Sequence, residues 1–306
     1  MTAYSKGLLA ILISAILWAS AGATAKILFH FAPPFVVAFH RFLLASLIIF
    51  PFFWKAKKPK GYFKILLPLG LFNAGNILFF YSGLPLTTAN SSSILGTTVP
   101  LITMLLSGFL IHESISIQTR VGIVLGLLGT LLIIVMPLFG SSQSTAGSLH
   151  GNLLILGSVI SWSLYIVYSR HTLSRGVFSP VISTAINIFV VTAVTGTAAL
   201  LTQNTITPPI ENISLYIWLI AYAAIGITVI TFFLFQWGVQ HVPATTAALK
   251  DYIQLIIGVG LNSFLLGEHL TTTYIIGSIF VGLGVFIATG RHWSKKIATL
   301  VSSRNN

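Results

Sequence analysis

Residues 7–18 read GLLAILISAILW, and residues 151–162 read GNLLILGSVISW. The two stretches lie 144 positions apart and are identical at seven of their twelve positions, from Gly7 and Gly151 to Trp18 and Trp162. The first stretch follows Lys6 and precedes small residues, which is also the pattern of a cleavable signal peptide. Because a signal peptide has no reason to recur in mid-chain, we interpret it as a retained helix that opens an internal repeat.

A second match, with an offset of 155, links the later parts of the two copies. It pairs Gly83 with Gly238, and it pairs FLIHESISIQTRVGIVLGLLG (109–129) with FLLGEHLTTTYIIGSIFVGLG (264–284). The larger offset indicates extra length in the second copy, for which the polar segment 202–214 is the best position. We therefore expect repeats at 1–139 and 151–290, a polar linker at 140–150 and a basic tail at 291–306.

The composition places the chain in a membrane. Of its 306 residues, 55% are hydrophobic and 7% are charged, whereas a soluble domain has roughly 25% charged residues. Cysteine is absent, which excludes disulfides, thiol catalysis and zinc sites built on cysteine. Ten runs of about 20 apolar residues are each long enough to span a bilayer. Their approximate ranges are 7–29, 35–54, 63–84, 87–110, 118–137, 150–170, 179–201, 215–240, 244–265 and 271–290.

These runs are continuous rather than alternating, which favours helices over the strands of a membrane barrel. The sequence thus predicts an all-α integral membrane protein with ten transmembrane helices arranged as two inverted five-helix repeats. The inversion follows because five is odd, so the second copy enters the membrane from the opposite side. Inverted repeats of this kind place a ligand site near the midplane, between the two halves.

The basic residues give the orientation. Of the 16 Lys and Arg residues, 13 lie in segments that share one side with the N-terminus, and the other three (Lys26, Arg41 and Lys250) lie within helices. The segments expected on the opposite side carry none, which is a strong positive-inside signal. We therefore expect both termini in the cytoplasm, the bacterial inner (plasma) membrane as the location, and contact of the cluster Lys55 to Lys64 with anionic membrane lipids.

The paired motifs resemble those of the EamA family within the drug/metabolite transporter superfamily. Each half opens with Ser-x-x-x-Trp and closes with a glutamate followed by spaced glycines, and the similarity covers nearly the whole chain. One departure is that Pro100 in the fourth helix is matched by Leu255 in the second repeat. The resemblance implies a secondary transporter, often an exporter of amino acids or related metabolites, and it does not fix the substrate.

Ionisable groups within hydrocarbon are functional candidates, because each costs several kcal/mol unless it faces a cavity or a partner. The strongest group is Lys250-Asp251-Tyr252, to which Gln254 adds a polar neighbour. Adjacent helical residues do not face one another, so we expect that Lys250 and Asp251 do not neutralise each other directly. The cluster then binds substrate or a proton, or it forms a structural ion pair with another helix.

Arg41 is a second candidate, since a guanidinium is a good carboxylate clamp. For Lys26 we expect the side chain to reach lipid headgroups, and for Glu113 and Glu268 we expect helix capping or interfacial solvation. The small-residue run 19–25 suggests a close helix contact or a cavity wall. The glycines of the fifth and tenth helices (Gly122, Gly126 and Gly129; Gly277, Gly282 and Gly284) suggest packing, either against each other or in a homodimer.

The remaining candidates are amides, small polar residues and aromatic walls at membrane depth. Ser93 and Thr97 share one face of the fourth helix with Gly96 and Pro100. Trp18 is a further aromatic candidate. The full set of predicted substrate-binding residues is Lys250, Asp251, Tyr252, Gln254, Arg41, Asn76, Tyr81, Ser93, Thr97, Trp162, Tyr165, Asn187, Gln236 and Trp237.

We therefore predict a carrier that works by alternating access on a small-molecule substrate, most simply an amino acid, a related zwitterion or an organic anion, in the direction of export. A coupling proton or counter-substrate is a further expected partner. One alternative is proton-coupled or exchange uptake of a nucleotide-like metabolite such as S-adenosylmethionine; another is a membrane-embedded enzyme or lipid-handling protein. No catalytic motif, metal-ligand spacing, cofactor or nucleic-acid surface is expected.

Overall fold

The structure is a computed structural model that describes residues 2–110, 117–135, 147–202, 207, 212–248, 250–268, 275–284 and 286–287. Every regular element in these ranges is a helix. Eight helical segments are long and apolar enough to cross a bilayer, and two shorter apolar helices accompany them, Arg120–Val135 and Ile275–Gly284. These segments coincide with the ten predicted stretches, so the all-α membrane architecture is confirmed. Most of the linker 140–150, the whole tail 291–306 and Glu113 lie outside the described residues.

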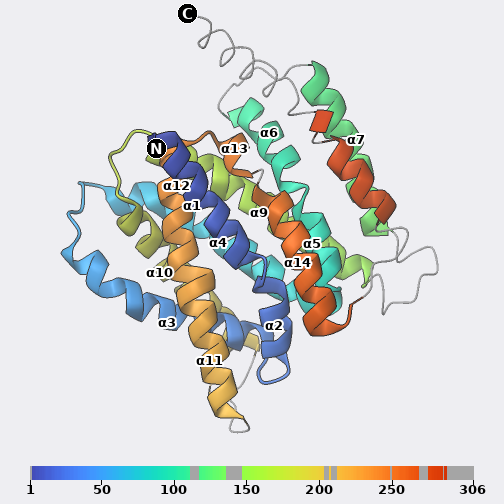
Figure 1. Ribbon diagram of the computed structural model, residues 1–306. Helices are drawn as coiled ribbons and strands as arrows, with labels where there is room; N and C mark the ends of the chain where they lie inside the picture. Colours follow the sequence, from blue (N-terminus) through green and yellow to red (C-terminus); the bar gives the residue numbers. More distant parts are fainter. Residues whose placement is uncertain are drawn as a thin grey trace, which may run out of the picture.

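The elements of the two halves follow the same order (Figure 1). The first half contains α1 (Ala3–Trp18), α2 (Ala21–Phe29), α3 (Pro34–Lys55), α4 (Tyr62–Gly83), the 3₁₀ turn η1 (Leu84–Leu86), α5 (Ala89–Gly96), α6 (Val99–Leu110) and α7 (Ile117–Val135). The second half contains α9 (Leu149–Leu173), α10 (Pro180–Thr202), α11 (Ile213–Ala224), the π-helical segment η3 (Ile225–Ile230), α12 (Thr231–His241), α13 (Ala244–Ala248), α14 (Lys250–Leu266) and the helix Ile275–Gly284.

Three of the predicted helices are irregular. Range 7–29 divides into α1 and α2, range 87–110 divides into α5 and α6, and in range 215–240 the π-helical segment η3 separates α11 from α12. Small and hydroxyl residues occupy the first two breaks, and the Thr97 hydroxyl donates a 2.6 Å hydrogen bond to the Ile94 carbonyl. Such side chains compete with the regular helical pattern. Irregular backbone at membrane depth is tolerated where it lies inside protein or lines a cavity, so the breaks point to the position of a site.

Most of the packing joins one half to the other. α1 packs on α12 and α9 on α4, while α3 packs on α10 and α5 on α14. The first two contacts are equivalent, because α1 and α9 occupy the same position in their repeats, as do α12 and α4. A Cβ atom at Gly238 would lie 3.0 Å from the Gly7 carbonyl oxygen, and one at Gly83 would lie 2.9 Å from the Gly151 carbonyl oxygen. The glycines paired by sequence therefore make the same helix contact twice.

The glycine seams of α7 and the helix Ile275–Gly284 pack against each other, and Figure 1 shows these two helices side by side at the edge of the bundle. A Cβ atom at Gly129 would lie 2.8 Å from the Gly277 carbonyl oxygen, and one at Gly284 would lie 2.5 Å from the Gly122 carbonyl oxygen. Gly122, Gly129, Gly277 and Gly284 therefore pack within the chain, which is one of the two roles predicted for these glycines.

Replacing Gly83 with alanine is expected to lower the melting temperature of the purified protein. The added methyl would meet the Gly151 carbonyl at 2.9 Å, and backbone cannot yield as a flexible side chain can; overpacking of this kind costs about 1–3 kcal/mol. Gly260→Ala in α14 is the matched control, because a Cβ atom there meets nothing within 4 Å. Equal melting temperatures for the two variants would contradict the close packing of α4 on α9.

Candidate functional site

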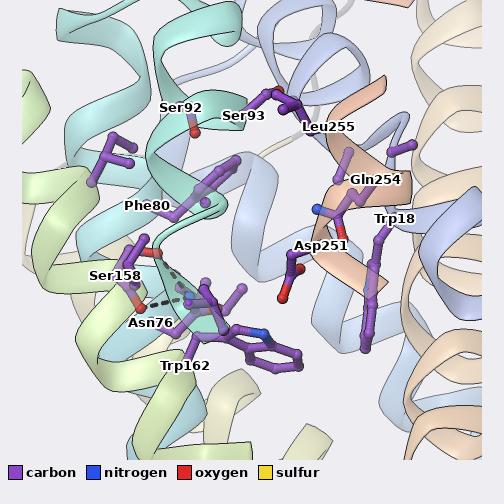
Figure 2. A pocket seen from close by; sticks show the side chains of 18 of the residues that line it. Trp18, Asn76, Phe80, Ser92, Ser93, Ser158, Trp162, Asp251, Gln254 and Leu255 are labelled. Carbon is purple, nitrogen blue, oxygen red and sulfur yellow. Dashed lines mark hydrogen bonds between the residues drawn. The ribbon is translucent and has the colours of Figure 1, made fainter. Parts of the chain in front are cut away.

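A cavity of about 150 Å³ lies between the two halves, at the helix breaks (Figure 2). Its walls come from α1, α2, α3, α4, α5 and α6 of the first half and from α9, α12 and α14 of the second. Apolar residues form part of the wall, including Trp18, Phe80, Trp162 and Phe232. The polar and charged lining residues are Arg41, Asn76, Ser92, Ser93, Ser158, Lys250, Asp251 and Gln254.

Lys250 and Asp251 form a buried ion pair in this wall. The Lys250 Nζ atom lies 2.6 Å from Asp251 Oδ1 and donates a second hydrogen bond, of 3.1 Å, to Gln254 Oε1. The two residues are 3% and 6% exposed. The expectation that they would not neutralise each other directly was wrong. The flexible four-carbon stem of Lys250 brings its ammonium group to the carboxylate of the next residue, although the two side chains leave the helix about 100° apart.

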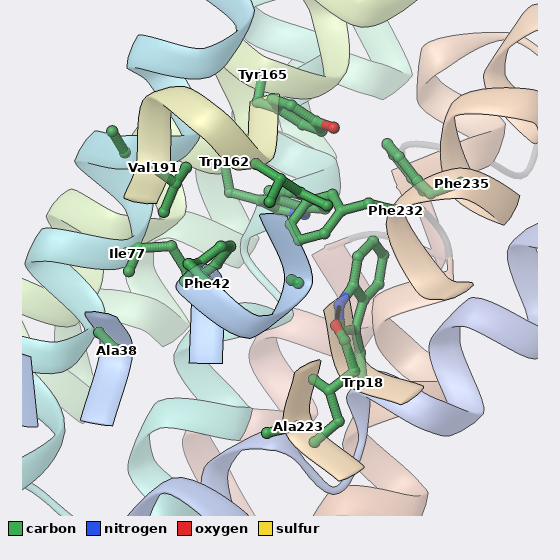
Figure 3. Close-up of a cluster of buried hydrophobic side chains, with 14 of the residues drawn as sticks. Trp18, Ala38, Phe42, Ile77, Trp162, Tyr165, Val191, Ala223, Phe232 and Phe235 are labelled. Carbon is green, nitrogen blue, oxygen red and sulfur yellow. Dashed lines mark hydrogen bonds between the residues drawn. The ribbon is translucent and has the colours of Figure 1, made fainter. Parts of the chain in front are cut away.

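Aromatic rings surround the ammonium group of Lys250. The Nζ atom lies 4.7 Å from the centre of the Trp18 ring, 5.4 Å from that of Trp162 and 6.0 Å from that of Phe235. Trp18 and Trp162 are repeat-related and meet edge to face, with ring centres 5.2 Å apart (Figure 3). Cation–π attraction is worth about 2 kcal/mol when the groups are desolvated, so these rings help to keep a charged lysine within the bundle.

One oxygen of Asp251 has no hydrogen-bond partner. Oδ1 receives Lys250, whereas Oδ2 is buried and unpartnered. Figure 2 shows the carboxylate pointing into the space between Trp18 and Asn76. Burying an unsatisfied acceptor costs about 1–3 kcal/mol, more when it is charged. The orphaned oxygen therefore marks a place where a ligand donor is needed.

Arg41 lines the cavity from α3 and is held by the π-helical segment η3. Its Nε donates to Thr228 Oγ1 at 2.7 Å, its Nη2 to the Ile227 carbonyl at 3.2 Å, and its Nη1 to the Tyr81 hydroxyl at 3.3 Å. The Ile227 carbonyl also accepts from the Trp18 indole, at 3.0 Å. No acidic side chain of the described ranges pairs with Arg41, so its charge is balanced only by neutral acceptors and is available to an anionic group.

Seven of the predicted site residues line the cavity: Lys250, Asp251, Gln254, Arg41, Asn76, Ser93 and Trp162. On the wall opposite Asp251, Asn76 donates through Nδ2 to the Ser158 hydroxyl at 2.7 Å and to the Ser158 carbonyl at 3.1 Å. The other seven do not line it: Tyr252, Tyr81, Thr97, Tyr165, Asn187, Gln236 and Trp237.

Three of these seven, Tyr81, Tyr165 and Gln236, lie behind cavity residues and support them. Tyr81 accepts from Arg41, and Tyr165 stacks on Trp162 with ring centres 4.8 Å apart while accepting a 2.5 Å hydrogen bond from Gln236. The Tyr252 hydroxyl instead donates to the Thr97 carbonyl at 3.3 Å, which joins α14 to the break after α5.

Asn187 and Trp237 have no such link to the cavity. Asn187 is fully buried in α10, and neither of its amide atoms has a hydrogen-bond partner. The Trp237 ring packs on His241 in the last turn of α12, with ring centres 4.7 Å apart.

Trp18, a further aromatic candidate from the sequence, also lines the cavity, whereas Phe80, Ser92, Ser158 and Phe232 line it without being in the predicted set. The repeat alignment carried a signal for Ser158, since it places this residue opposite Ser14. The small-residue run 19–25 does contribute to the wall, through Ala19, Ala21 and Gly22. The phenylalanines carry no distinguishing pattern among the 22 in the chain.

A second polar cluster lies one turn beyond the cavity along α2 and α5. Lys26 Nζ lies 3.3 Å from Glu268 Oε1 and donates to the Thr87 carbonyl at 2.8 Å, so the expected reach to lipid headgroups is wrong. Glu268 accepts from the backbone N–H groups of Ala89 and Asn90, at 2.9 and 2.8 Å. Capping was one of the two roles expected for it, and the structure shows that Glu268 caps α5, a helix of the other repeat. The cluster thus ties α2, α5 and the end of α14 together.

Breaking this cluster should open that end of the cavity. Gly96→Cys is a suitable reporter, because Gly96 lines the cavity, a Cβ atom there meets nothing within 4 Å, and the chain has no other cysteine. In detergent-purified protein, Glu268→Gln is expected to raise the rate at which this thiol reacts with a maleimide by about tenfold, the effect of about 1.4 kcal/mol on an opening equilibrium. Lys57→Gln, which removes an exposed charge elsewhere, should leave the rate unchanged. Equal rates in all three proteins would mean that the cluster does not hold the cavity closed.

The fold and the cavity define an integral membrane protein of two five-helix repeats around a shared, charged site. The profile of the EamA-like transporter family matches residues 5–135 and again residues 149–290. The chain therefore belongs to the EamA-like transporter family, and both the family and its relatives are transporters.

Two relatives and one solved structure illustrate the similarity. The uncharacterized transporter YetK of Bacillus subtilis (strain 168) is 28% identical over 86% of this chain and 80% of its own length. A probable amino-acid metabolite efflux pump of Salmonella typhimurium is 24% identical over 92% of this chain and 93% of its own. A crystal structure with 20% sequence identity superposes with a TM-score of 0.66 over 93% of this chain and 96% of its own, which shows a shared fold.

Proposed function

We propose that this transporter exports a small zwitterionic metabolite, most simply an amino acid, across the bacterial inner membrane by alternating access. The observation that carries the proposal is the charge arrangement of the cavity. Two basic groups, Lys250 and Arg41, share the wall with a carboxylate that keeps one oxygen free. A substrate with one ammonium and one carboxylate group offers a partner to each side of this arrangement.

Other ligand classes fit less well. A purely cationic compound is repelled by Arg41 and Lys250, and the described lining offers it a single carboxylate, that of Asp251. Unpaired charge is costly in a poorly solvated site. The volume of about 150 Å³ is below the roughly 300–1,000 Å³ of pockets that hold drug-sized ligands. Both features favour an amino acid over a nucleotide-like metabolite such as S-adenosylmethionine. The apolar walls from Trp18, Phe80 and Phe232 suit an apolar substrate side chain.

The repeat architecture supports alternating access. Equivalent helix pairs, α1 with α12 and α9 with α4, make matching glycine contacts at the two ends of the bundle. If each repeat can adopt the arrangement that the other has now, the cavity opens to the opposite side, which is the usual mechanism of inverted-repeat carriers. The name of the Salmonella typhimurium relative supports export, and the positive-inside distribution supports cytoplasmic termini.

Counterflow in proteoliposomes tests the proposal. Vesicles loaded with unlabelled amino acids should accumulate the matching radiolabelled amino acid without altering it chemically. Asp251→Asn is expected to lower this flux by at least about tenfold, since the lost charge-assisted contact is worth more than 1.4 kcal/mol. Both proteins should be compared at equal amounts of monodisperse material, because removing one member of a buried pair also destabilises the fold.

Tyr252→Phe is the matched control. It changes the residue next to Asp251, lies outside the cavity lining, and loses only a 3.3 Å hydrogen bond to the Thr97 carbonyl. Its flux should remain within about twofold of the parent protein. Loss of flux in Tyr252→Phe with retention in Asp251→Asn would refute the assignment of the cavity, and a chemically altered substrate would point instead to an enzyme.

A further inference from the structure

The cavity already contains a matched pair of charges that resembles its proposed substrate. Lys250 presents an ammonium group and Asp251 a carboxylate, 2.6 Å apart. Among the described residues that line the cavity, Asp251 is the sole acid, and it faces two bases. A second ammonium group that enters must therefore compete with Lys250 for the same carboxylate.

We propose that Lys250 and Asp251 pair with each other until a zwitterion binds, and that the zwitterion binds between them by exchange of ion-pair partners. The substrate ammonium group takes the Asp251 carboxylate, while the substrate carboxylate takes the released Lys250 ammonium group together with Arg41. This inference rests on the proposed function, and it assigns to each end of the substrate its own subsite.

The ammonium subsite is formed by the Asp251 carboxylate and the rings of Trp18 and Trp162. Oδ2 of Asp251 is buried and has no hydrogen-bond partner among the described residues, and Figure 2 shows the carboxylate pointing into the cavity. The Trp18 and Trp162 rings already hold an ammonium group at 4.7 and 5.4 Å. Carboxylate and aromatic faces together are the chemistry that recognises an ammonium ion.

The carboxylate subsite is formed by Lys250 and Arg41. A guanidinium group has five N–H donors, and three hydrogen bonds from Arg41, to Thr228, Ile227 and Tyr81, are present. Donors therefore remain for a carboxylate on the cavity side. Lys250 has a flexible four-carbon stem, so its ammonium group can leave Asp251 while it stays within the cavity.

Partner exchange explains how the site selects a zwitterion. Insertion of a zwitterion pairs every charge and leaves the net charge of the cavity unchanged. An amine without a carboxylate takes Asp251 and strands Lys250, which is strongly unfavourable in a site of low polarity. An acid without an amine can pair with Arg41 but gives the free Asp251 oxygen no donor, so it binds less tightly than the zwitterion.

Two charge-removing variants should therefore switch specificity in opposite directions. Lys250→Gln keeps a polar side chain that is one atom shorter and removes the charge that pairs with Asp251, so it is expected to bind amines at least about tenfold more tightly than the parent protein does. Asp251→Asn removes the charge that pairs with Lys250, so this variant should bind acids more tightly than the parent protein does, by a similar factor. The probes are leucine with 3-methylbutylamine and 4-methylpentanoate, and phenylalanine with 2-phenylethylamine and 3-phenylpropanoate. Binding is measured in detergent from the ligand-dependent rise in melting temperature.

The double variant Lys250→Gln/Asp251→Asn is the matched control, and it should bind neither amines nor acids more tightly than the parent protein does. Each switch is predicted separately, so a single variant that folds is sufficient for the test. If both single variants fail to fold, the parent protein still carries the test, because it must bind an amino acid more tightly than either of its single-charge analogues. A Lys250→Gln variant that binds amines no better than the parent would overturn the proposal, as would the absence of binding for every probe.

This test can be separated from that of the proposed function. If the variants switch specificity but the protein shows no flux, the partner exchange is supported and the carrier function is contradicted. If an amino acid is transported but no variant switches specificity, the carrier function is supported and the partner exchange is contradicted.

Discussion

A lysine and an aspartate that are adjacent in the chain form a buried ion pair between the two halves of this membrane protein. Removing either partner of such a pair leaves an uncompensated buried charge and costs about 3–5 kcal/mol. Three aromatic rings and the Gln254 amide further stabilise the lysine. The carboxylate nevertheless keeps one oxygen unsatisfied. The pair is thus stable enough to persist in lipid and incomplete enough to accept a ligand.

Interruptions in the helices make this arrangement possible. Ala19 lies between α1 and α2, Gly96 ends α5, and both line the cavity. The π-helical segment η3 presents the Ile227 carbonyl and the Thr228 hydroxyl to Arg41. A continuous helix has no spare carbonyl groups in its middle, so a bundle of regular helices could not hold an unpaired guanidinium group in this way. Charge and irregular backbone are therefore found together.

The two repeats contribute differently to the site. At an offset of 155, Lys250 and Asp251 correspond to Leu95 and Gly96 of the first half. The second repeat thus supplies the ion pair, whereas the first supplies Arg41 and, at Gly96, open space, since a Cβ atom there would meet nothing within 4 Å. Trp18 and Trp162, in contrast, are retained in both copies and meet at the centre. The helix packing is therefore similar in the two repeats, as alternating access requires. The charged side chains, in contrast, differ between the repeats and form a single site.

The sequence by itself determined the ten membrane segments, the internal repeat and the glycines at the repeat contacts, because apolar length and self-similarity are properties of the chain alone. It also placed Lys250, Asp251 and Arg41 at membrane depth. Only the tertiary structure decided that Lys250 pairs with Asp251, that Lys26 pairs with Glu268, and that Tyr252 and Asn187 stay outside the cavity. Neighbouring residues on a helix point about 100° apart, so a break or a small rotation decides which side chain faces the cavity, and the linear pattern does not record that rotation.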